Sequence, residues 1–162
     1  MAIYRSIHTS FWEDTKIIED MTPEDRYFML YLLTNPHTNQ VGCYEISKNQ
    51  MKNELGYSVD TIENLIERHE NVLKTIKYSK KTREVLILNW YKYNWNISPK
   101  VIACIKKELK AVKCEEFINY IDTICIPYIY GIHEKIYPID IISQEKEKEK
   151  EKEKEKEKEI MR

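Results

Sequence analysis

The chain has 162 residues, 42% hydrophobic content and a formal net charge of −1, which suits one folded core with a small appendage. No run of about 18 apolar residues occurs, so we expect no membrane span, and the N-terminus lacks the apolar centre of a signal peptide. The four cysteines form no Cys-x-x-Cys pair, which favours reduced thiols and a cytoplasmic protein.

Two helices are predicted in the first 35 residues. Ser10 and Glu13 match a capping box for a short helix that carries the apolar residues Phe11, Trp12, Ile17 and Ile18. Thr22-Pro23-Glu24-Asp25 combines an N-cap, a proline at the first helical position and two acids at the positive end of the dipole. The helix that follows is apolar all round over Tyr27–Leu33, which predicts the buried central helix of the domain. Asn35-Pro36 should end it.

Residues 41–73 predict a strand followed by two short helices. Val41–Ile46 alternates and is rich in β-formers. Ser47 and Gln50 form a capping box for a helix that runs to Leu55 and ends at Gly56. Ser58 is a second N-cap, and the following apolar residues recur at helical spacing, namely Ile62, Leu65, Ile66, His69, Val72 and Leu73. Two short helices joined by a glycine-containing turn are typical of a helix-turn-helix.

A β-hairpin is predicted next, with strands over Thr75–Ser79 and Glu84–Tyr91 around a polar turn at 80–83. Together with the preceding elements it predicts a mainly helical α+β fold, a winged helix in which the hairpin is the wing. Asn89–Trp95 interleaves aromatic rings with a lysine, as a single-strand stacking surface does. A strand over Glu84–Tyr91 would turn half of those rings inward, which favours packing.

The remaining chain predicts a helical extension and a charged tail. Ser98-Pro99 should open a helix with Val101, Ile102, Ile105, Leu109 and Val112 on one face. The apolar stretch 117–132 should break near Pro127 and Gly131. We therefore expect a winged-helix domain over 1–97, a helical extension over 98–143 that packs on that domain or on another copy, and a disordered Glu-Lys tail over 144–162.

The Glu-Lys tract over 145–159 has no apolar residue to bury, so it should contribute nothing to folding. Deleting residues 145–162 is expected to leave the melting temperature essentially unchanged in a circular dichroism melt. A drop of several degrees would mean that the tract docks on the folded part.

Enzymatic chemistry is disfavoured, and we expect no enzyme, no cofactor and no metal. Three glycines are present, too few for a phosphate-cradling glycine loop. His69-Glu70 and His133-Glu134 each begin an H-E-x-x-H motif whose last position holds another residue. A zinc site built from the cysteines with His37 or His69 lacks ligand spacing.

The uneven charge distribution predicts which residues would meet DNA. Residues 59–71 carry four acids against one base, so phosphates should be repelled by the second helix of the helix-turn-helix. Contacts are expected instead from the first helix, where asparagines could reach base edges, from the wing and from the helix after Pro99. The expected DNA-binding residues are Lys48, Asn49, Lys52, Asn53, Lys77, Lys80, Lys81, Arg83, Lys106, Lys107 and Lys110.

Several blocks of the sequence strongly resemble the N-terminal domain of phage and prophage replisome organisers, a family related to the primosomal protein DnaD of low-GC Gram-positive bacteria. The blocks are RSIHTSFWED, KIIED, TPEDRYFMLYLLTNPHTNQVGCYEI, ELGYS and NWYKYNW with SPKV, and the resemblance covers about residues 4–113. Members of that family usually continue into a C-terminal domain, where this chain has its Glu-Lys tract.

The resemblance implies a winged-helix fold and a role in starting DNA replication. The protein would bind origin DNA, expected to be double-stranded, self-associate, and help recruit the replicative helicase or its loader in the cytoplasm of a bacterial host. Two alternatives stay open: an oligomerisation module of the primosome with weak DNA affinity, which the acidic helix favours, and a winged-helix transcriptional regulator.

Overall fold

A computed structural model describes residues 2–136 and 155–156 of the chain. The strands are β1 (Cys43–Glu45), β2 (Ile76–Ser79) and β3 (Glu84–Ile87). The helical elements are η1 (Thr9–Glu13), η2 (Lys16–Asp20), α1 (Pro23–Thr34), α2 (Lys48–Leu55), α3 (Val59–Glu67), η3 (Arg68–Val72), α4 (Trp90–Asn94), α5 (Pro99–Leu109), α6 (Glu115–Tyr120), η4 (Ile121–Cys125) and α7 (Ile126–Ile136). The fold is therefore mainly helical with one small sheet.

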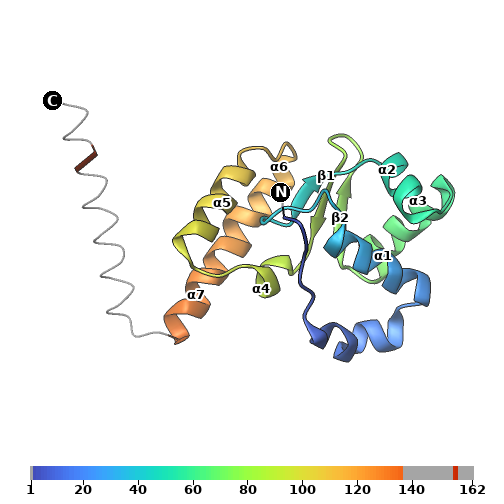
Figure 1. Cartoon of the computed structure of the whole chain (residues 1–162), viewed down its shortest axis with the longest axis horizontal. Helices are drawn as coiled ribbons and strands as arrows, with labels where there is room; N and C mark the ends of the chain where they lie inside the picture. The colour runs from blue at the N-terminus through green and yellow to red at the C-terminus, as the bar shows by residue number, and fades with distance from the viewer. Residues whose placement is uncertain (1, 137–154, 157–162) are drawn as a thin grey trace.

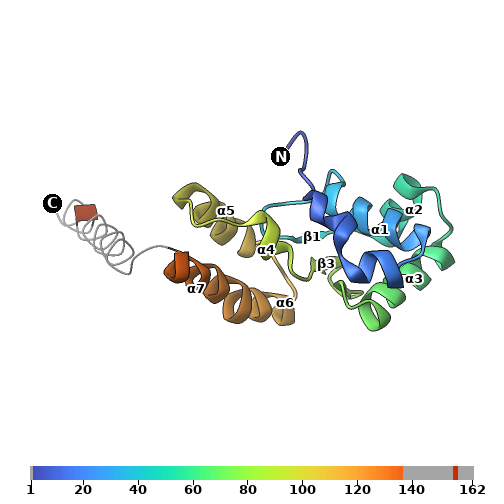
Figure 2. The ribbon, with the colours of Figure 1, turned by 90° about the horizontal axis from the view of Figure 1, so that it is seen from below.

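The antiparallel sheet lies between two groups of helices, α1–α3 on one side and α5–α7 on the other (Figures 1 and 2). Its strand order is β1-β3-β2, and β3 pairs with both neighbours, Cys43 facing Leu86 and Ile76 facing Ile87. All four residues of β3 are buried, as expected of a strand covered on both faces. The hairpin predicted after residue 74 is thus present.

Helix α1 forms at the predicted start signal. The Thr22 hydroxyl accepts the backbone N–H of Asp25, and the Asp25 carboxylate accepts that of Thr22, a complete capping box. Phe28 and Leu32 are fully buried, but Tyr27 is 47% exposed, so the expectation of an all-round buried helix is wrong. Leu30, Tyr31 and Leu33 are half-buried against the core, so most of the helix is covered and the side with Tyr27 faces solvent.

Helices α2 and α3 begin where the sequence predicts, and α2 also ends at the predicted glycine. Ser47 and Gln50 form the capping box, Gly56 ends α2 in the left-handed conformation at φ 83°, and the Ser58 hydroxyl caps α3. The apolar face continues into η3, where His69 is buried. Val72 is wrongly placed on that face, because the π-helical turn shifts it outward and leaves it 66% exposed.

The predictions for the first and the third strand are too long. The strand predicted over Val41–Ile46 is reduced to Cys43–Glu45, after Gly42 with its positive φ of 78°. The strand predicted over Glu84–Tyr91 ends at Ile87, because Asn89 adopts φ 66° and starts helix α4. The helix orients the rings of the Trp90–Trp95 segment differently from a strand. Three of these rings, Trp90, Tyr91 and Trp95, are nevertheless buried, so the preference for packing over stacking is confirmed for them.

The capping box predicted at Ser10 is wrong. The N-cap of the 3₁₀ helix η1 is His8, two residues before Ser10, and no side chain caps the helix. Of its expected apolar residues and those of η2, Phe11 and Ile17 are buried, whereas Trp12 and Ile18 are 55% and 54% exposed. Two short turns of different helical type cannot keep one apolar face in register over the whole segment.

The helix predicted to break near Pro127 continues instead through α6, η4 and α7. The Ile126 backbone N–H bonds to the Ile121 carbonyl, five residues back, and this π-helical turn is the kind of irregularity that admits a proline. The C-terminal part of the described chain shares one core with α1, to which it contributes Ile105 of α5, Val112 of the following loop, and Phe117, Ile121 and Cys125 of α6 and η4. The Glu-Lys tail lies outside the described residues except for Glu155 and Lys156, which are helical and exposed.

Candidate nucleic-acid interface

Helix α2 is held on α1 by a small polar cluster. The Tyr31 hydroxyl donates to Glu54 at 2.7 Å, and His37 Nε2 lies 2.6 Å from the same carboxylate. Burial and the neighbouring Glu54 carboxylate raise the pKa of Tyr31, which keeps the phenol as the donor. With Met51 and Leu55 buried below, the outer face of α2 has a fixed orientation.

The predicted α2 residues differ in what their side chains do. Asn49, Lys52 and Asn53 are exposed and stand on the outer face. Lys48 is half-buried, and its ammonium lies 3.1 Å from the Glu63 carboxylate of α3. Lys48 therefore links the two helices, and a phosphate would have to compete with Glu63 for it.

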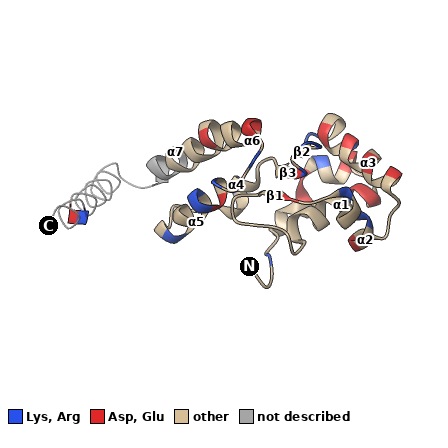
Figure 3. Cartoon of the chain, turned by 90° about the horizontal axis from the view of Figure 1, so that it is seen from above, with Lys and Arg blue, Asp and Glu red and all other residues tan. Residues whose placement is uncertain are grey.

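The exposed face of α3 is acidic, as Figure 3 shows. Ile62, Leu65 and Ile66 point into the core, while Asp60, Glu63 and Glu67 are exposed. The fourth acid behaves differently: the Glu70 carboxylate accepts the backbone N–H of Tyr78 at 2.7 Å and ties η3 to β2. Three carboxylates on the outer surface give this face the negative potential that the sequence predicts.

The tip of the β2–β3 hairpin is basic. Lys80, Lys81 and Arg83 are exposed, and within the part of the chain that the structure describes none of them forms an ion pair. Arg83 adopts φ 56°, and the Ser79 hydroxyl accepts the Thr82 backbone N–H at 3.2 Å, which closes the turn. The hairpin therefore presents three unpaired cations at its end.

The other predicted hairpin lysine is already paired. Lys77 Nζ lies 3.1 Å from the Glu116 carboxylate of α6. Both side chains are more than half exposed, so this pair should contribute little to stability and is easily exchanged for a phosphate.

Helix α5 carries a second group of cations. Lys106, Lys107 and Lys110 are exposed. The buried Glu84 carboxylate, at the start of β3, accepts the backbone N–H groups of Lys113 and Cys114 at 2.8–3.2 Å. This contact fastens the segment after α5 beside the base of the basic turn, a link that no sequence pattern signals because 29 residues separate Glu84 from Lys113.

Neither a metal-binding cluster nor a membrane-spanning helix is found among the described residues. Within residues 2–136 and 155–156, no group of three or more histidine, cysteine or acidic side chains is placed to hold a metal ion. None of the helices described there is long and apolar enough to cross a membrane.

A scan of protein-family models, a search of curated proteins and a search of solved structures each found no match to this chain.

Proposed function

We propose that this chain is a winged-helix DNA-binding protein that acts in the initiation of DNA replication. The element order α1-β1-α2-α3-β2-β3 supports the winged helix, because it joins a helix-turn-helix to a three-stranded sheet with a terminal hairpin. In this reading the β2–β3 hairpin is the wing.

The observation that carries the proposal is the wing tip with its three cations, Lys80, Lys81 and Arg83, none of which forms an ion pair with another described residue. Lysine and arginine side chains that neutralise phosphates release condensed counterions, which supplies most of the affinity for DNA. Arg83 also offers a guanidinium suited to bidentate phosphate contact. Lys77, Lys106, Lys107 and Lys110 would extend this basic track.

Helix α2, rather than α3, is the element that we propose enters a groove. Its exposed Asn49 and Asn53 carry amides that can pair with adenine, and Lys52 stands beside them. The acids of α3 would repel phosphates, so this helix should face away from the duplex.

The replication role rests on the sequence blocks described above. We propose that the protein binds origin DNA, self-associates and helps recruit the replicative helicase or its loader in the cytoplasm of the host. The second candidate, an oligomerisation module with weak DNA affinity, is favoured by the acidic outer face of α3 with Asp60, Glu63 and Glu67.

Replacing Lys80, Lys81 and Arg83 together with alanine is expected to weaken binding to duplex DNA at least about tenfold near 0.1 M salt. Since each lost phosphate contact removes about 0.9 from the slope of log affinity against log salt, the slope should fall by up to about three units. Fluorescence anisotropy titrations of labelled origin and random duplexes over a range of salt concentrations measure both quantities.

The matched control is the double variant Glu63→Gln/Glu67→Gln, which removes charge from α3 without touching the wing. It is expected to leave DNA binding unchanged or to strengthen it. If the wing variant binds like the parent while the α3 variant loses sequence preference, α3 is the reading helix. If the parent itself barely binds DNA, the oligomerisation module is the better description.

A further inference from the structure

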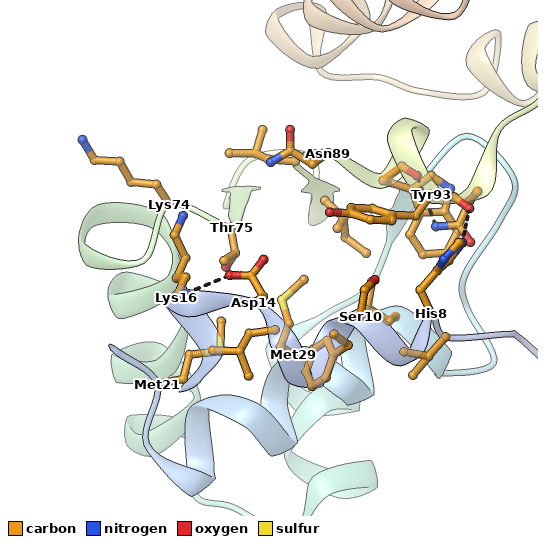
Figure 4. Close-up of a pocket in the computed structure, with 18 of the residues that line it drawn as sticks. His8, Ser10, Asp14, Lys16, Met21, Met29, Lys74, Thr75, Asn89 and Tyr93 are labelled. Carbon is orange, nitrogen blue, oxygen red and sulfur yellow. Dashed lines mark hydrogen bonds between the residues drawn. The ribbon is translucent and has the colours of Figure 1, made fainter. Parts of the chain in front are cut away.

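A cavity of about 170 Å³ lies at the end of the β2–β3 hairpin opposite to the basic turn. It opens where four segments meet: the η1–η2 region, α1, the Lys74-Thr75 loop and the chain from Ile87 to Asn94 (Figure 4). Because Ile76 and Ile87 pair at this end and Ser79 and Glu84 pair at the other, a ligand here would leave the wing tip free.

The floor of the cavity is apolar and adaptable. Phe11, Ile17, Met21, Met29 and Ile87 line it, and all five are buried in the core. Methionine side chains are flexible and polarizable, so Met21 and Met29 can adjust to groups of different shape. The floor suits one bulky aliphatic or aromatic group.

The rim carries cations on one side. Lys16 and Lys74 come from different segments but lie side by side at one edge of the cavity in Figure 4, where the Lys74 ammonium extends outward from the rim. Both are exposed, and neither forms an ion pair within the described part of the chain. The Asp14 carboxylate lies near them and accepts the Lys16 backbone N–H at 2.9 Å, which partly neutralises the rim. On the other side, the His8 and Tyr93 rings meet edge to face at 5.5 Å.

The backbone around the cavity is held in an unusual shape. Of the three non-glycine residues with positive φ in the described chain, Lys74 (53°) and Asn89 (66°) both border it. Such conformations persist only where surrounding contacts fix them. Here Thr75 N–H bonds to the His69 carbonyl at 2.8 Å, and Leu88 N–H bonds to the Thr75 carbonyl at 3.0 Å. The cavity is thus preorganised for an occupant.

We propose that this cavity docks an acidic segment of a partner protein, with one bulky apolar side chain on the Met21–Met29 floor and flanking carboxylates beside Lys16 and Lys74. Charge complementarity selects the acidic segment, because the lining has two lysines without an ion pair among the described residues and one carboxylate, Asp14. The proposal does not depend on DNA binding, since the cavity and the wing tip occupy opposite ends of the hairpin.

The probe is a fluorescein-labelled peptide with a Leu-Phe pair flanked on both sides by aspartates. One comparison peptide has lysines in place of the aspartates, and another has serines in place of Leu-Phe. The full chain is expected to bind only the first peptide. Lys16→Glu/Lys74→Glu should lower that affinity about tenfold or more, whereas Lys16→Arg/Lys74→Arg and the exposed α5 control Lys100→Glu should stay within about twofold of the parent.

Methyl NMR on methionine-labelled protein locates the bound peptide. The Met21 and Met29 signals are expected to shift, while that of Met51, fully buried in α2, stays in place. Failure of the parent to bind the acidic peptide, equal losses in Lys16→Glu/Lys74→Glu and Lys100→Glu, or unmoved Met21 and Met29 signals would each overturn the proposal. The docking proposal would also be overturned if the Lys16→Glu/Lys74→Glu variant still bound the peptide but had lost self-association or binding of single-stranded DNA.

Discussion

Replacing Gly42 with alanine is expected to lower the free energy of unfolding by at least about 3 kcal/mol, by combining a strained backbone with a steric clash. Gly42 adopts φ 78°, and a Cβ added there would lie 2.3 Å from Cγ of Trp90. The ring cannot easily move away, because Trp90 is 3% exposed and its indole N–H donates to the Gln40 carbonyl at 2.9 Å. Urea denaturation followed by circular dichroism measures the loss.

Gly56 provides the matched control for this substitution. It has nearly the same backbone conformation, with φ 83°, but nothing lies within 4 Å of an added Cβ. Gly56→Ala should therefore cost only about 1 kcal/mol, from the left-handed conformation alone. Similar losses for the two variants would contradict the contact between Gly42 and Trp90 as the main cause.

Local signals explain which parts of the fold were predictable. The caps at Thr22, Ser47 and Ser58 each combine a side-chain acceptor with a specific spacing, and all three helices begin where these residues stand. The hairpin was predictable for the same reason: two β-rich runs flank a short polar turn.

The wrong predictions of secondary structure come from competition between local preference and packing. Asn89–Asn94 has the aromatic content of a strand, yet it turns into α4 because a helix buries Trp90 and Tyr91 together. The stretch through Pro127 stays helical because the π-helical turn of η4 removes the need for a regular hydrogen bond there. Neither outcome has a sequence signal of its own.

The candidate sites also have features that the sequence could predict and features that it could not. Exposed lysines on a predicted turn could be identified from the sequence, and Lys80, Lys81 and Arg83 do lie at the hairpin tip. The ion pairs of the other lysines could not be predicted, because only the fold brings Lys48 to Glu63 and Lys77 to Glu116. The cavity was also beyond sequence reasoning, because its lining comes from segments far apart in the chain.

A buried polar cluster between α1 and η3 also lay beyond sequence reasoning. Asp25, expected only as an acid at the start of α1, is fully buried and accepts two hydrogen bonds from Arg68, at 3.1 Å from Nε and 2.6 Å from Nη2. Burial acts to raise the pKa of Asp25, but the hydrogen bonds from Arg68 and Thr22 outweigh it and hold the pKa below its usual value. This carboxylate therefore stabilises the fold until the pH falls below the ordinary range of an aspartate.

The residue beside Arg68 adds an acid sensitivity at higher pH. His69 is fully buried with its ring centroid 5.0 Å from that of Phe28, and neither ring nitrogen has a hydrogen-bond partner among the described residues. Burial lowers the pKa of His69 to about 4, from 6.5. As the pH falls through this interval, the unfolded chain takes up a proton that the folded chain does not, so stability is lost with falling pH.

Replacing His69 with leucine is expected to remove that loss, which for the parent amounts to about 3 kcal/mol between pH 7 and pH 4. At pH 7 the variant should be as stable as the parent or slightly more stable, because an unpaired buried polar group is exchanged for an apolar one of similar size. Urea denaturation across this pH interval measures both effects. Near pH 4 the Asp25 carboxyl of the unfolded chain also begins to take up a proton, so the difference between the parent and the variant isolates the contribution of His69. His8→Gln, a change at an exposed histidine, should keep the parent's pH dependence. A parent whose stability is flat over the interval, or a His69→Leu variant with the parent's slope, would show that His69 is not the acid-sensitive group.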